Sequence, residues 1–399
     1  MAKKSKKNKK IDKALVYSPA KIKVVGIGGG GGNAVHRMQD GFFRGVDFIA
    51  INTDVQDLEH CDVKKKIHIG KNLTRGLGAG MNPELGRQAA EETKAELIEA
   101  LKGADLIFLT AGLGGGTGTG AIPVVAEVCK ELGALTVAVV TKPFSFEGAQ
   151  RSRIAQEGLM RLKDKVDTLI VVPNDRIFAV IGKDTPIIKA FEIVDDVLRQ
   201  AVQGVADLIA IPGIVNVDFA DVKAIMQEAG TAIVGLGMAS GQDRAIKAIN
   251  QAIHSPLLES TMDGAKGVLF GISGGKDLKM NEVNEIARVI AESIDSSAKV
   301  IFGAYHDKKM RAGFIKVTLI ATGFSGISLN RIANQPGTSL FSSQPVEKMN
   351  LHESSKEGAV ISENKGEKDK AHKPSKDKSG AEIWEIPAFL RRGKKSREK

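Results

Sequence analysis

Residues 114–120 read Gly-Gly-Gly-Thr-Gly-Thr-Gly, and this stretch decides the fold prediction. It follows an apolar run at 106–110 that indicates a buried strand, and it leads into a predicted helix over 118–132. Glycine lets backbone N–H groups approach a polyphosphate closely, and the start of the following helix carries partial positive charge. A tight turn alone would not require five glycines in seven residues. The stretch therefore predicts a phosphate-binding turn between a strand and a helix.

A second glycine-rich stretch, Gly-Ile-Gly-Gly-Gly-Gly-Gly-Asn at 26–33, lies between a predicted strand at 22–27 and a predicted helix at 34–41. Two such turns in one domain predict a single nucleotide bound from both sides. Residues 26–31 also fit the Gly-x-Gly-x-x-Gly dinucleotide pattern, with Asp47 or Asp54 as the acid that would bind ribose. An NAD-dependent oxidoreductase therefore stays open, although it assigns no role to the turn at 114–120.

Neither turn carries the Gly-Lys-Ser/Thr sequence of a P-loop, so no lysine within the turns would neutralise phosphate charge. Backbone amides, the dipoles of the two helices, the hydroxyl groups of Thr117 and Thr119, and a bound cation would have to do so. Because a triphosphate carries enough charge to engage both turns, the pattern favours a nucleoside triphosphate.

Strand and helix patterns alternate from residue 22 to residue 172, which predicts a Rossmann-like parallel sheet with helices on both faces. Its predicted helices include one over 83–101 and one over 149–163. A long apolar-faced helix beginning at 186 would join this α/β domain to a smaller α+β domain with a mixed sheet. The predicted parts are a disordered basic arm (1–20), a nucleotide-binding domain (21–185), a central connecting helix (186–211), a C-terminal α+β domain (212–332), a flexible linker (333–380) and a C-terminal peptide with a basic end (381–399).

The net charge of +10 is carried by the two ends of the 399-residue chain, +8 in residues 1–23 and +4 in residues 346–399. The body between them is close to neutral, so we expect no specific nucleic-acid binding there. No run of about 18 apolar residues occurs, and we therefore expect no membrane span. Cys61 and Cys129 fit no disulfide or metal-ligand pattern, which favours a reducing cytosolic compartment.

The C-terminal end contains a short apolar segment behind a polar tether. Residues 342–380 consist mainly of Lys, Glu, Ser, Asp and Gly without an aromatic residue, a composition that cannot bury enough apolar surface to fold. The sequence Ile-Trp-Glu-Ile-Pro-Ala-Phe-Leu-Arg-Arg follows at 383–392. Such a segment is typical of a peptide that docks into a groove on a partner.

Four side chains could surround a nucleotide at the carboxyl edge of the sheet. Glu147 and Arg151 open a predicted helix, where an acid can accept from ribose hydroxyls and an arginine can reach phosphate. Phe191 and Asp195 lie one helical turn apart, so a ring could stack on a base while a carboxylate accepts two hydrogens from a guanine edge. Each also has an ordinary structural explanation, with Phe191 in a core and Glu147–Arg151 as a surface ion pair.

The segment Asn-Val-Asp-Phe-Ala-Asp-Val at 216–222 places Asp218 and Asp221 on one face of a helix start. The pair could cap that helix, or it could polarise a water for attack on a γ-phosphate, directly or through a cation. The segment follows a helix about 30 Å long, so it should lie at the opposite end from the glycine turns. It cannot easily reach a nucleotide that its own chain holds.

With these residues in view, the chain resembles the FtsZ family of bacterial cell-division GTPases in the tubulin superfamily. Residues 114–120 look like the signature loop of that superfamily and residues 216–222 look like its catalytic synergy loop, with similarity over about 22–332 and at the C-terminal peptide. The resemblance implies the tubulin/FtsZ fold and GTP as substrate, with Mg²⁺ held mainly through the nucleotide, K⁺ as a further candidate and no metal site built from the protein. The implied GTP-binding residues are Gly29, Gly30, Gly31, Gly32, Asn33, Gly116, Thr117, Gly118, Glu147, Arg151, Asn174, Phe191 and Asp195.

The resemblance also implies a homopolymer in which subunits stack head to tail. Asn216, Asp218 and Asp221 of one subunit would complete the GTP site of the next, in cytoplasmic filaments of the mid-cell division ring. A scaffold that binds nucleotide without hydrolysing it stays open as an alternative.

The C-terminal peptide is similar to the family's terminal peptide, which implies binding to membrane-tethering adaptors such as FtsA or ZipA, besides other division regulators. The residues implied in adaptor binding are Ile386, Pro387, Phe389 and Leu390. Trp384 and the basic extension at 393–399 depart from the family pattern and leave the identity of the adaptor open.

Overall fold

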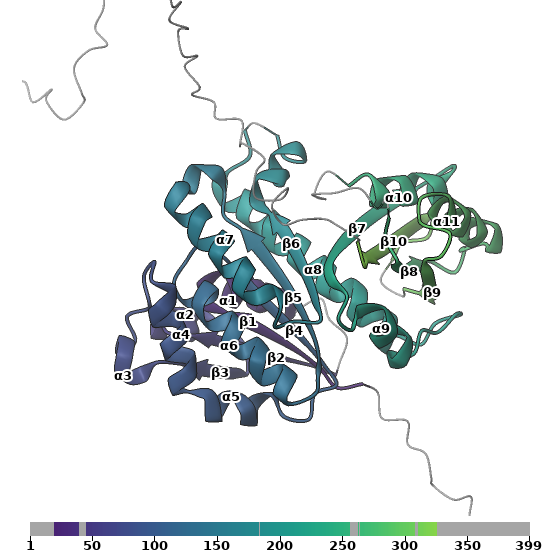
Figure 1. Ribbon diagram of the computed structural model, residues 1–399. Coiled ribbons are helices and arrows are strands. Elements are labelled where there is room, and N and C mark those ends of the chain that lie inside the picture. The colour runs from purple at the N-terminus through teal and green to yellow at the C-terminus, as the bar shows by residue number, and fades with distance from the viewer. Residues whose placement is uncertain are drawn as a thin grey trace, which may run out of the picture. The chain divides into compact units, whose positions relative to one another are not determined.

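The computed structural model describes residues 20–39, 45–182, 184–255, 262, 264–307 and 310–324 (Figure 1). Residues 1–19 of the basic arm, the whole linker (333–380) and the C-terminal peptide (381–399) lie outside these residues. Within them the chain forms one sheet of ten strands in the order β3-β2-β1-β4-β5-β6-β7-β10-β8-β9. The mixed α/β fold with a large, mostly parallel sheet agrees with the predicted fold class, which is confirmed.

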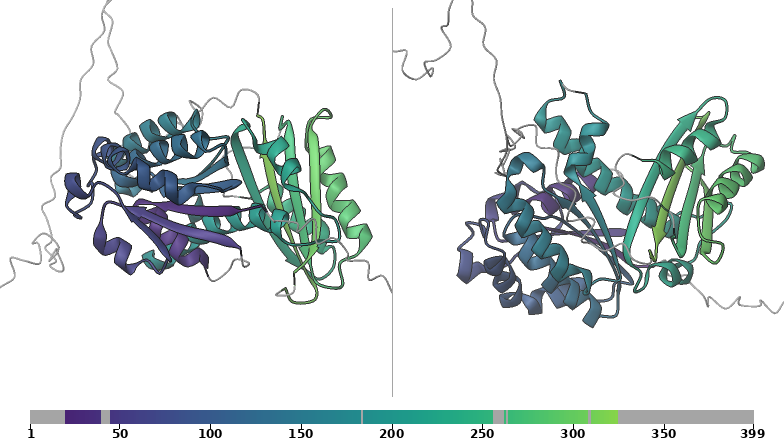
Figure 2. Two further views of the ribbon diagram at one scale, coloured as in Figure 1. Left: turned by 90° about the horizontal axis from the view of Figure 1, so that it is seen from below. Right: turned by 45° about the horizontal axis from the view of Figure 1, so that its top comes forward.

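The first part of the sheet consists of parallel strands with a helix after almost every strand. Its elements are β1 (Ile22–Ile27), α1 (Gly28–Met38), β2 (Val46–Asn52), α2 (Val55–His60), β3 (Lys65–His68), α3 (Lys71–Thr74), α4 (Pro83–Glu92), α5 (Lys94–Leu101), β4 (Leu106–Gly112), α6 (Thr117–Glu131), β5 (Leu135–Lys142), η2 (Ser145–Glu147), α7 (Ala149–Lys163), β6 (Thr168–Pro173) and η3 (Asn174–Ala179). Figure 2 shows helices on both faces of these strands. Neighbouring residues on a strand therefore enter opposite cores, as Val24 and Val25 do.

The second part continues the same sheet. Its elements are α8 (Ile187–Ala210), α9 (Phe219–Met226), β7 (Gly230–Ser240), α10 (Arg244–Ile253), β8 (Gly267–Gly274), α11 (Met280–Glu292), β9 (Lys299–His306) and β10 (Phe314–Thr322). Strand β7 pairs in parallel with β6, whereas β10 is antiparallel to both β7 and β8, which makes the sheet mixed. Helices α10 and α11 cover one face of these strands, and α8 and α9 contribute to the core on the other face.

Three details of the first part differ from the sequence prediction. Helix α1 begins at Gly28 rather than near residue 34, so the second glycine-rich stretch forms its first turns. The single helix expected over 83–101 is divided at Thr93, whose hydroxyl bonds the Ala89 carbonyl at 3.1 Å. Strand β3, Lys-Lys-Ile-His, was not predicted because its two lysines hide the alternation of apolar and polar residues that would mark a strand.

Across the described ranges, no helix has the length and apolarity that crossing a membrane requires.

Candidate nucleotide site

The two glycine-rich turns meet at the carboxyl edge of the parallel strands, after β1 and β4. A Cβ added to Gly28 would lie 2.7 Å from the backbone nitrogen of Gly118, and one added to Gly30 would lie 3.4 Å from Gly112. Gly28 also has a positive φ of 72°, a conformation that L side chains rarely adopt. The starts of α1 and α6 are therefore in direct contact, and only residues without a side chain allow this approach.

Both helices begin without a capping side chain. Neither α1 nor α6 has a side-chain hydrogen bond at its N-cap or an acidic residue of its own in its first turn. The first N–H groups of a helix have no partner within the helix, and they carry the positive end of its dipole. The two turns lie together, and two such helix ends side by side suit a polyphosphate, whose binding here stays a prediction.

The threonine hydroxyls at the start of α6 are used within the protein. Thr117 Oγ1 lies 2.6 Å from Thr53 Oγ1, which joins α6 to the residue after β2. Thr119 Oγ1 accepts a hydrogen bond of 2.9 Å from the Gly114 N–H. The Thr119 hydroxyl therefore helps to close the turn. Because accepting this bond leaves its own O–H proton able to donate, phosphate binding by Thr119 stays a prediction.

Glu147 and Arg151 form the ion pair that was the ordinary structural alternative for these residues. One carboxylate oxygen of Glu147 pairs with the Arg151 guanidinium, and the other accepts a hydrogen bond of 2.9 Å from the Phe144 N–H. The Glu147 side chain is only 15% exposed, whereas that of Arg151 is 43% exposed. Arg151 can therefore change rotamer toward a ligand more readily than Glu147.

Aromatic and amide groups lie next to this ion pair. Phe191 packs edge-on against Phe144 with ring centroids 5.4 Å apart and stays 40% exposed, so it is not the fully buried core residue of the structural alternative. Asn174 opens η3 directly after β6, is buried, and its Oδ1 has no hydrogen-bond partner. Buried acceptors nearly always find a donor, so an unpaired oxygen at a site edge fits a ligand that supplies one.

Asp195 lies one turn beyond Phe191 on α8 and pairs with Arg37 of α1 at 3.0 Å. Burial raises the pKa of Asp195 to about 6, although the Arg37 guanidinium acts in the opposite direction. Sequence reasoning missed Arg37. The available signal was its position four residues after Asn33, which places both on one face of a helix.

The structure does not bring Asn216, Asp218 and Asp221 together with the glycine turns. Helix α8 has 24 residues, about 36 Å, and it separates Asp195 in its first half from the 211–218 loop after its end. Thr168 Oγ1, at the first residue of β6, donates to the Met226 carbonyl at the end of α9 at 2.5 Å. Helix α9 thus lies at the amino edge of the parallel strands, opposite the glycine turns.

Side-chain bonds fix the start of α9 in a defined shape. Asn216 Oδ1 accepts a hydrogen bond of 2.7 Å from the Gly213 N–H. Asp218 is the N-cap, and its Oδ1 accepts from the Asp221 N–H at 2.7 Å. The capping alternative is therefore realised, and it leaves the second oxygen of Asp218 at an exposed position.

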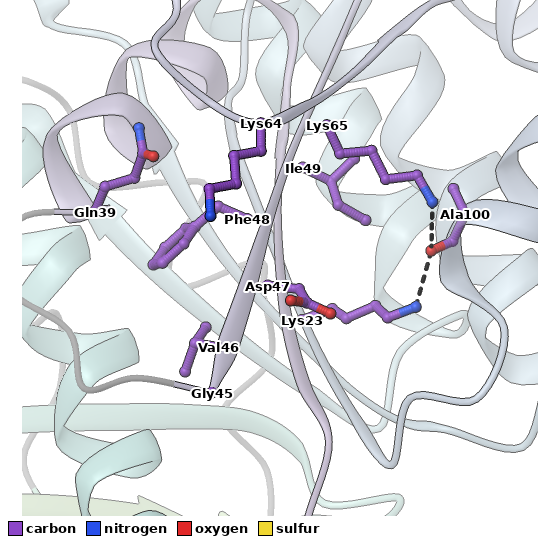
Figure 3. Close-up of a pocket in the computed structure, with 10 residues that line it drawn as sticks. All are labelled: Lys23, Gln39, Gly45, Val46, Asp47, Phe48, Ile49, Lys64, Lys65 and Ala100. Atoms are coloured by element: carbon purple, nitrogen blue, oxygen red, sulfur yellow. Dashed lines mark hydrogen bonds between the residues drawn. The ribbon is translucent and has the colours of Figure 1, made fainter.

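The two acids that the dinucleotide alternative offers for ribose binding lie at opposite edges of the parallel strands. Asp47 lies at the amino edge, in a cavity of about 670 Å³ where Lys23 and Lys65 both donate to the Ala100 carbonyl (Figure 3). Asp54 caps α2, and its Oδ1 accepts from the backbone of Gln56 at 2.9 Å. Asp47 therefore lies at the wrong edge for the Rossmann pattern, and Asp54, at the carboxyl edge, already uses one carboxylate oxygen to cap α2.

In the part of the chain that the structure describes, no group of three or more His, Cys, Asp or Glu side chains is arranged to hold a metal ion.

Comparison with known proteins agrees with this geometry. Residues 21–182 match the Tubulin/FtsZ family, GTPase domain, and residues 230–325 match the FtsZ family, C-terminal domain. The structure is similar to that of an FtsZ dimer from M. jannaschii, with 46% identity, a TM-score of 0.73, and coverage of 77% of this chain and 89% of that chain.

More distant proteins share the fold alone. GDP-bound CetZ1 from Haloferax volcanii matches with 21% identity and a TM-score of 0.68 over 79% of this chain and 98% of that chain. A GTPγS-bound protofilament of CetZ2 from Haloferax volcanii matches with 23% identity and a TM-score of 0.67 over 78% of this chain and 96% of that chain. Fold and site together define a tubulin-like GTPase. The chain belongs to the FtsZ family.

Proposed function

We propose that this protein polymerises head to tail in a GTP-dependent manner and hydrolyses GTP at the contact between subunits. The observation that carries the proposal is the separation of two half-sites: glycine turns at the carboxyl edge and Asp218 and Asp221 at the amino edge. Stacking subunits in one direction brings the carboxylates of one onto the nucleotide of the next. Such a heterologous contact does not close on itself and builds a filament. Structures of M. jannaschii FtsZ and of CetZ2 are described as a dimer and a protofilament.

We assign the parts of GTP to the predicted residues as follows. The backbone N–H groups of Gly29, Gly30, Gly31, Gly32 and Asn33, and those of Gly116, Thr117 and Gly118, receive the phosphates. Glu147 accepts from the ribose and Arg151 turns toward phosphate. Asn174, Phe191 and Asp195 hold the base, with the ionised Asp195 accepting from the guanine N–H groups.

Hydrolysis then uses groups from two subunits. Mg²⁺, carried mainly by the nucleotide, with K⁺ as a further candidate, supplies charge neutralisation when bound. Because Asp218 Oδ1 holds the helix cap, its second oxygen and the Asp221 carboxylate are the groups that orient the attacking water. Asn216 bonds the Gly213 N–H and so holds the loop that presents them.

The proposed cellular role is a cytoplasmic filament of the mid-cell division ring. The C-terminal peptide would bind membrane-tethering adaptors such as FtsA or ZipA through Ile386, Pro387, Phe389 and Leu390, and other division regulators would act on the polymer. These four residues lie outside the described part of the chain. Deleting 383–399 should abolish adaptor binding while polymer and hydrolysis persist, and adaptor affinity that survives the deletion would contradict this assignment.

The proposal is tested by measuring phosphate release and sedimentation across a range of protein concentrations. We expect low specific activity below a threshold and a rise where polymer pellets, because only polymer contains complete sites. A specific activity independent of concentration would contradict a shared site. Polymer without phosphate release would instead indicate the non-hydrolysing scaffold.

A further inference from the structure

The last turns of α8 pack directly onto the C-terminal strands through positions that lack side chains. A Cβ at Gly303 of β9 would lie 2.9 Å from Leu208, and one at Gly271 of β8 would lie 2.6 Å from it. A Cβ at Gly204 would lie 2.4 Å from Thr318 of β10. These contacts show that one helical face, with residues 204 and 208 a turn apart, rests on three neighbouring strands.

One pleat further along the same strands is a row of polar side chains. Ser273 is the registered partner of both Tyr305 on β9 and Lys316 on β10. Each is two residues from a position that touches α8, so all three point to the α8 side of the sheet. Asp207, which precedes Leu208, lies on the same helical face and is only 6% exposed. Four polar groups thus meet between α8 and the sheet.

The four groups interact with one another. The Tyr305 hydroxyl hydrogen-bonds the Asp207 carboxylate and the Ser273 side chain, and both Tyr305 and Ser273 are buried. Burial raises the pKa of Tyr305, so the hydroxyl keeps its proton and can donate it to the carboxylate. Burial lowers the pKa of Lys316, which attraction to Asp207 opposes. Buried polar groups of this kind are costly unless they satisfy one another, and then they fix one geometry.

This cluster lies at the two points where the 211–218 loop is attached. The loop begins where α8 ends, four residues after Asp207. It is then bound to β9, because the N–H groups of Ile214 and Val215 donate to the Ala304 carbonyl at 2.7 and 3.0 Å. Ala304 adjoins Tyr305 in sequence. The hydrogen bond between Tyr305 and Asp207 therefore joins the start of the loop to its anchor on the strand.

We propose that Asp207, Tyr305, Ser273 and Lys316 are positioning residues for GTP hydrolysis on the neighbouring subunit. They hold the end of α8 against β9, and thereby set where the 211–218 loop presents Asp218 and Asp221. The inference rests on the proposed function, since the loop has a catalytic target only when another subunit supplies GTP. A displacement of about 1 Å in such a loop is enough to lower a rate strongly.

The test uses the full chain and compares Tyr305→Phe with Thr318→Val. Tyr305→Phe removes one hydroxyl from the four-residue cluster, whereas Thr318→Val removes one from a neighbouring residue that packs against Gly204. We expect Tyr305→Phe to bind GTP as tightly as the parent chain, to sediment as polymer, and to show a kcat per polymerised subunit lower by roughly tenfold with unchanged KM. Thr318→Val should keep the parental kcat.

A second pair of variants tests whether the positive charge of Lys316 opposite Asp207 is required. Lys316→Arg keeps a cation opposite Asp207 and should retain most of the hydrolysis rate, whereas Lys316→Met should resemble Tyr305→Phe. Loss of GTP binding by unpolymerised Tyr305→Phe, or equal kcat for Tyr305→Phe and Thr318→Val, would overturn the positioning role. Asp221→Ala measured beside them distinguishes the failures: if it hydrolyses GTP normally, the shared site itself is wrong.

Discussion

Asp218 Oδ1 accepts a hydrogen bond of 2.7 Å from the backbone N–H of Asp221, so these two acids form the capped first turn of α9. The two acids therefore contribute different groups to the helix cap. Asp218 stabilises the helix with one oxygen and exposes the other, while Asp221 contributes only its backbone to the cap. The structural role and the proposed catalytic role can therefore be separated by substitution.

Replacing Asp218 by Asn should separate them. Asparagine caps helices about as well as aspartate, so the free energy of unfolding should change by less than about 0.5 kcal/mol, but the charge that acts on water is lost. Asp218→Ala should cost about 1 kcal/mol in addition to the loss of hydrolysis. Urea unfolding and phosphate release on both variants test this, and an Asn variant that hydrolyses GTP at the parental rate would show that the charge is not required.

Replacing Asp195 by Asn should make the nucleotide-free protein more stable at neutral pH. The pKa of Asp195 is raised by burial from 3.8 to about 6, so folding disfavours the ionised carboxylate. The stability from this group is fully present below pH 4 and is lost as pH rises through 6. Asp195→Asn should therefore gain about 1–3 kcal/mol at pH 7.5 and nothing at pH 4. Asp196→Asn, at the neighbouring exposed position, is the control and should show no such pH-dependent gain.

The same carboxylate should make GTP affinity depend on pH. Only ionised Asp195 can accept both guanine N–H groups, so affinity should fall as pH drops below about 6. Asp195→Asn should bind GTP at least tenfold more weakly at pH 7.5 and lose this pH dependence. Calorimetric titration with GTP and with ATP checks both points, and an Asn variant that still prefers GTP strongly would exclude Asp195 from base recognition.

Replacing Gly118 by Ala should damage the phosphate site. Its Cβ would lie 2.8 Å from the Gly112 carbonyl oxygen, so the start of α6 must move. Gly115→Ala is the matched control for folding, because a Cβ there meets nothing within 4 Å. We expect Gly118→Ala to bind GTP at least tenfold more weakly and to unfold about 1–3 kcal/mol more easily, while Gly115→Ala keeps the parental stability. Equal stability of the two variants would contradict the close packing of the two turns.

Local patterns predicted much of the fold because strand and helix periodicity is strong here. Helix α7 spans the predicted residues 149–163, and β4 begins at the predicted Leu106. The position where α1 begins could not be predicted from local patterns, because its first residues are glycines, which have low helix propensity. Tertiary packing decides it: a Cβ on Gly31 would lie 2.4 Å from the Thr110 carbonyl oxygen, so the glycines serve the contact between helix and strand.

The candidate site was predictable where its parts are contiguous in sequence. The glycine turns and the 216–222 segment each carry their own pattern, and the length of α8 placed them at opposite ends. The pairing of Arg37 with Asp195 could not be predicted, since 158 positions separate them and only the packing of α1 on α8 joins them. The Asp207 cluster was missed for the same reason, because strand register aligns its members.

The central claim, a GTP site completed by a second subunit, is tested most directly by mixing two variants that are each inactive alone. Asp221→Ala should bind GTP but lack the hydrolytic carboxylate, and Gly118→Ala should supply Asp221 but bind GTP poorly. We expect phosphate release to appear when the two are mixed, because Asp221 of the second variant can act on GTP held by the first. A mixture as inactive as its separate components, although the two chains co-sediment, would contradict a shared site.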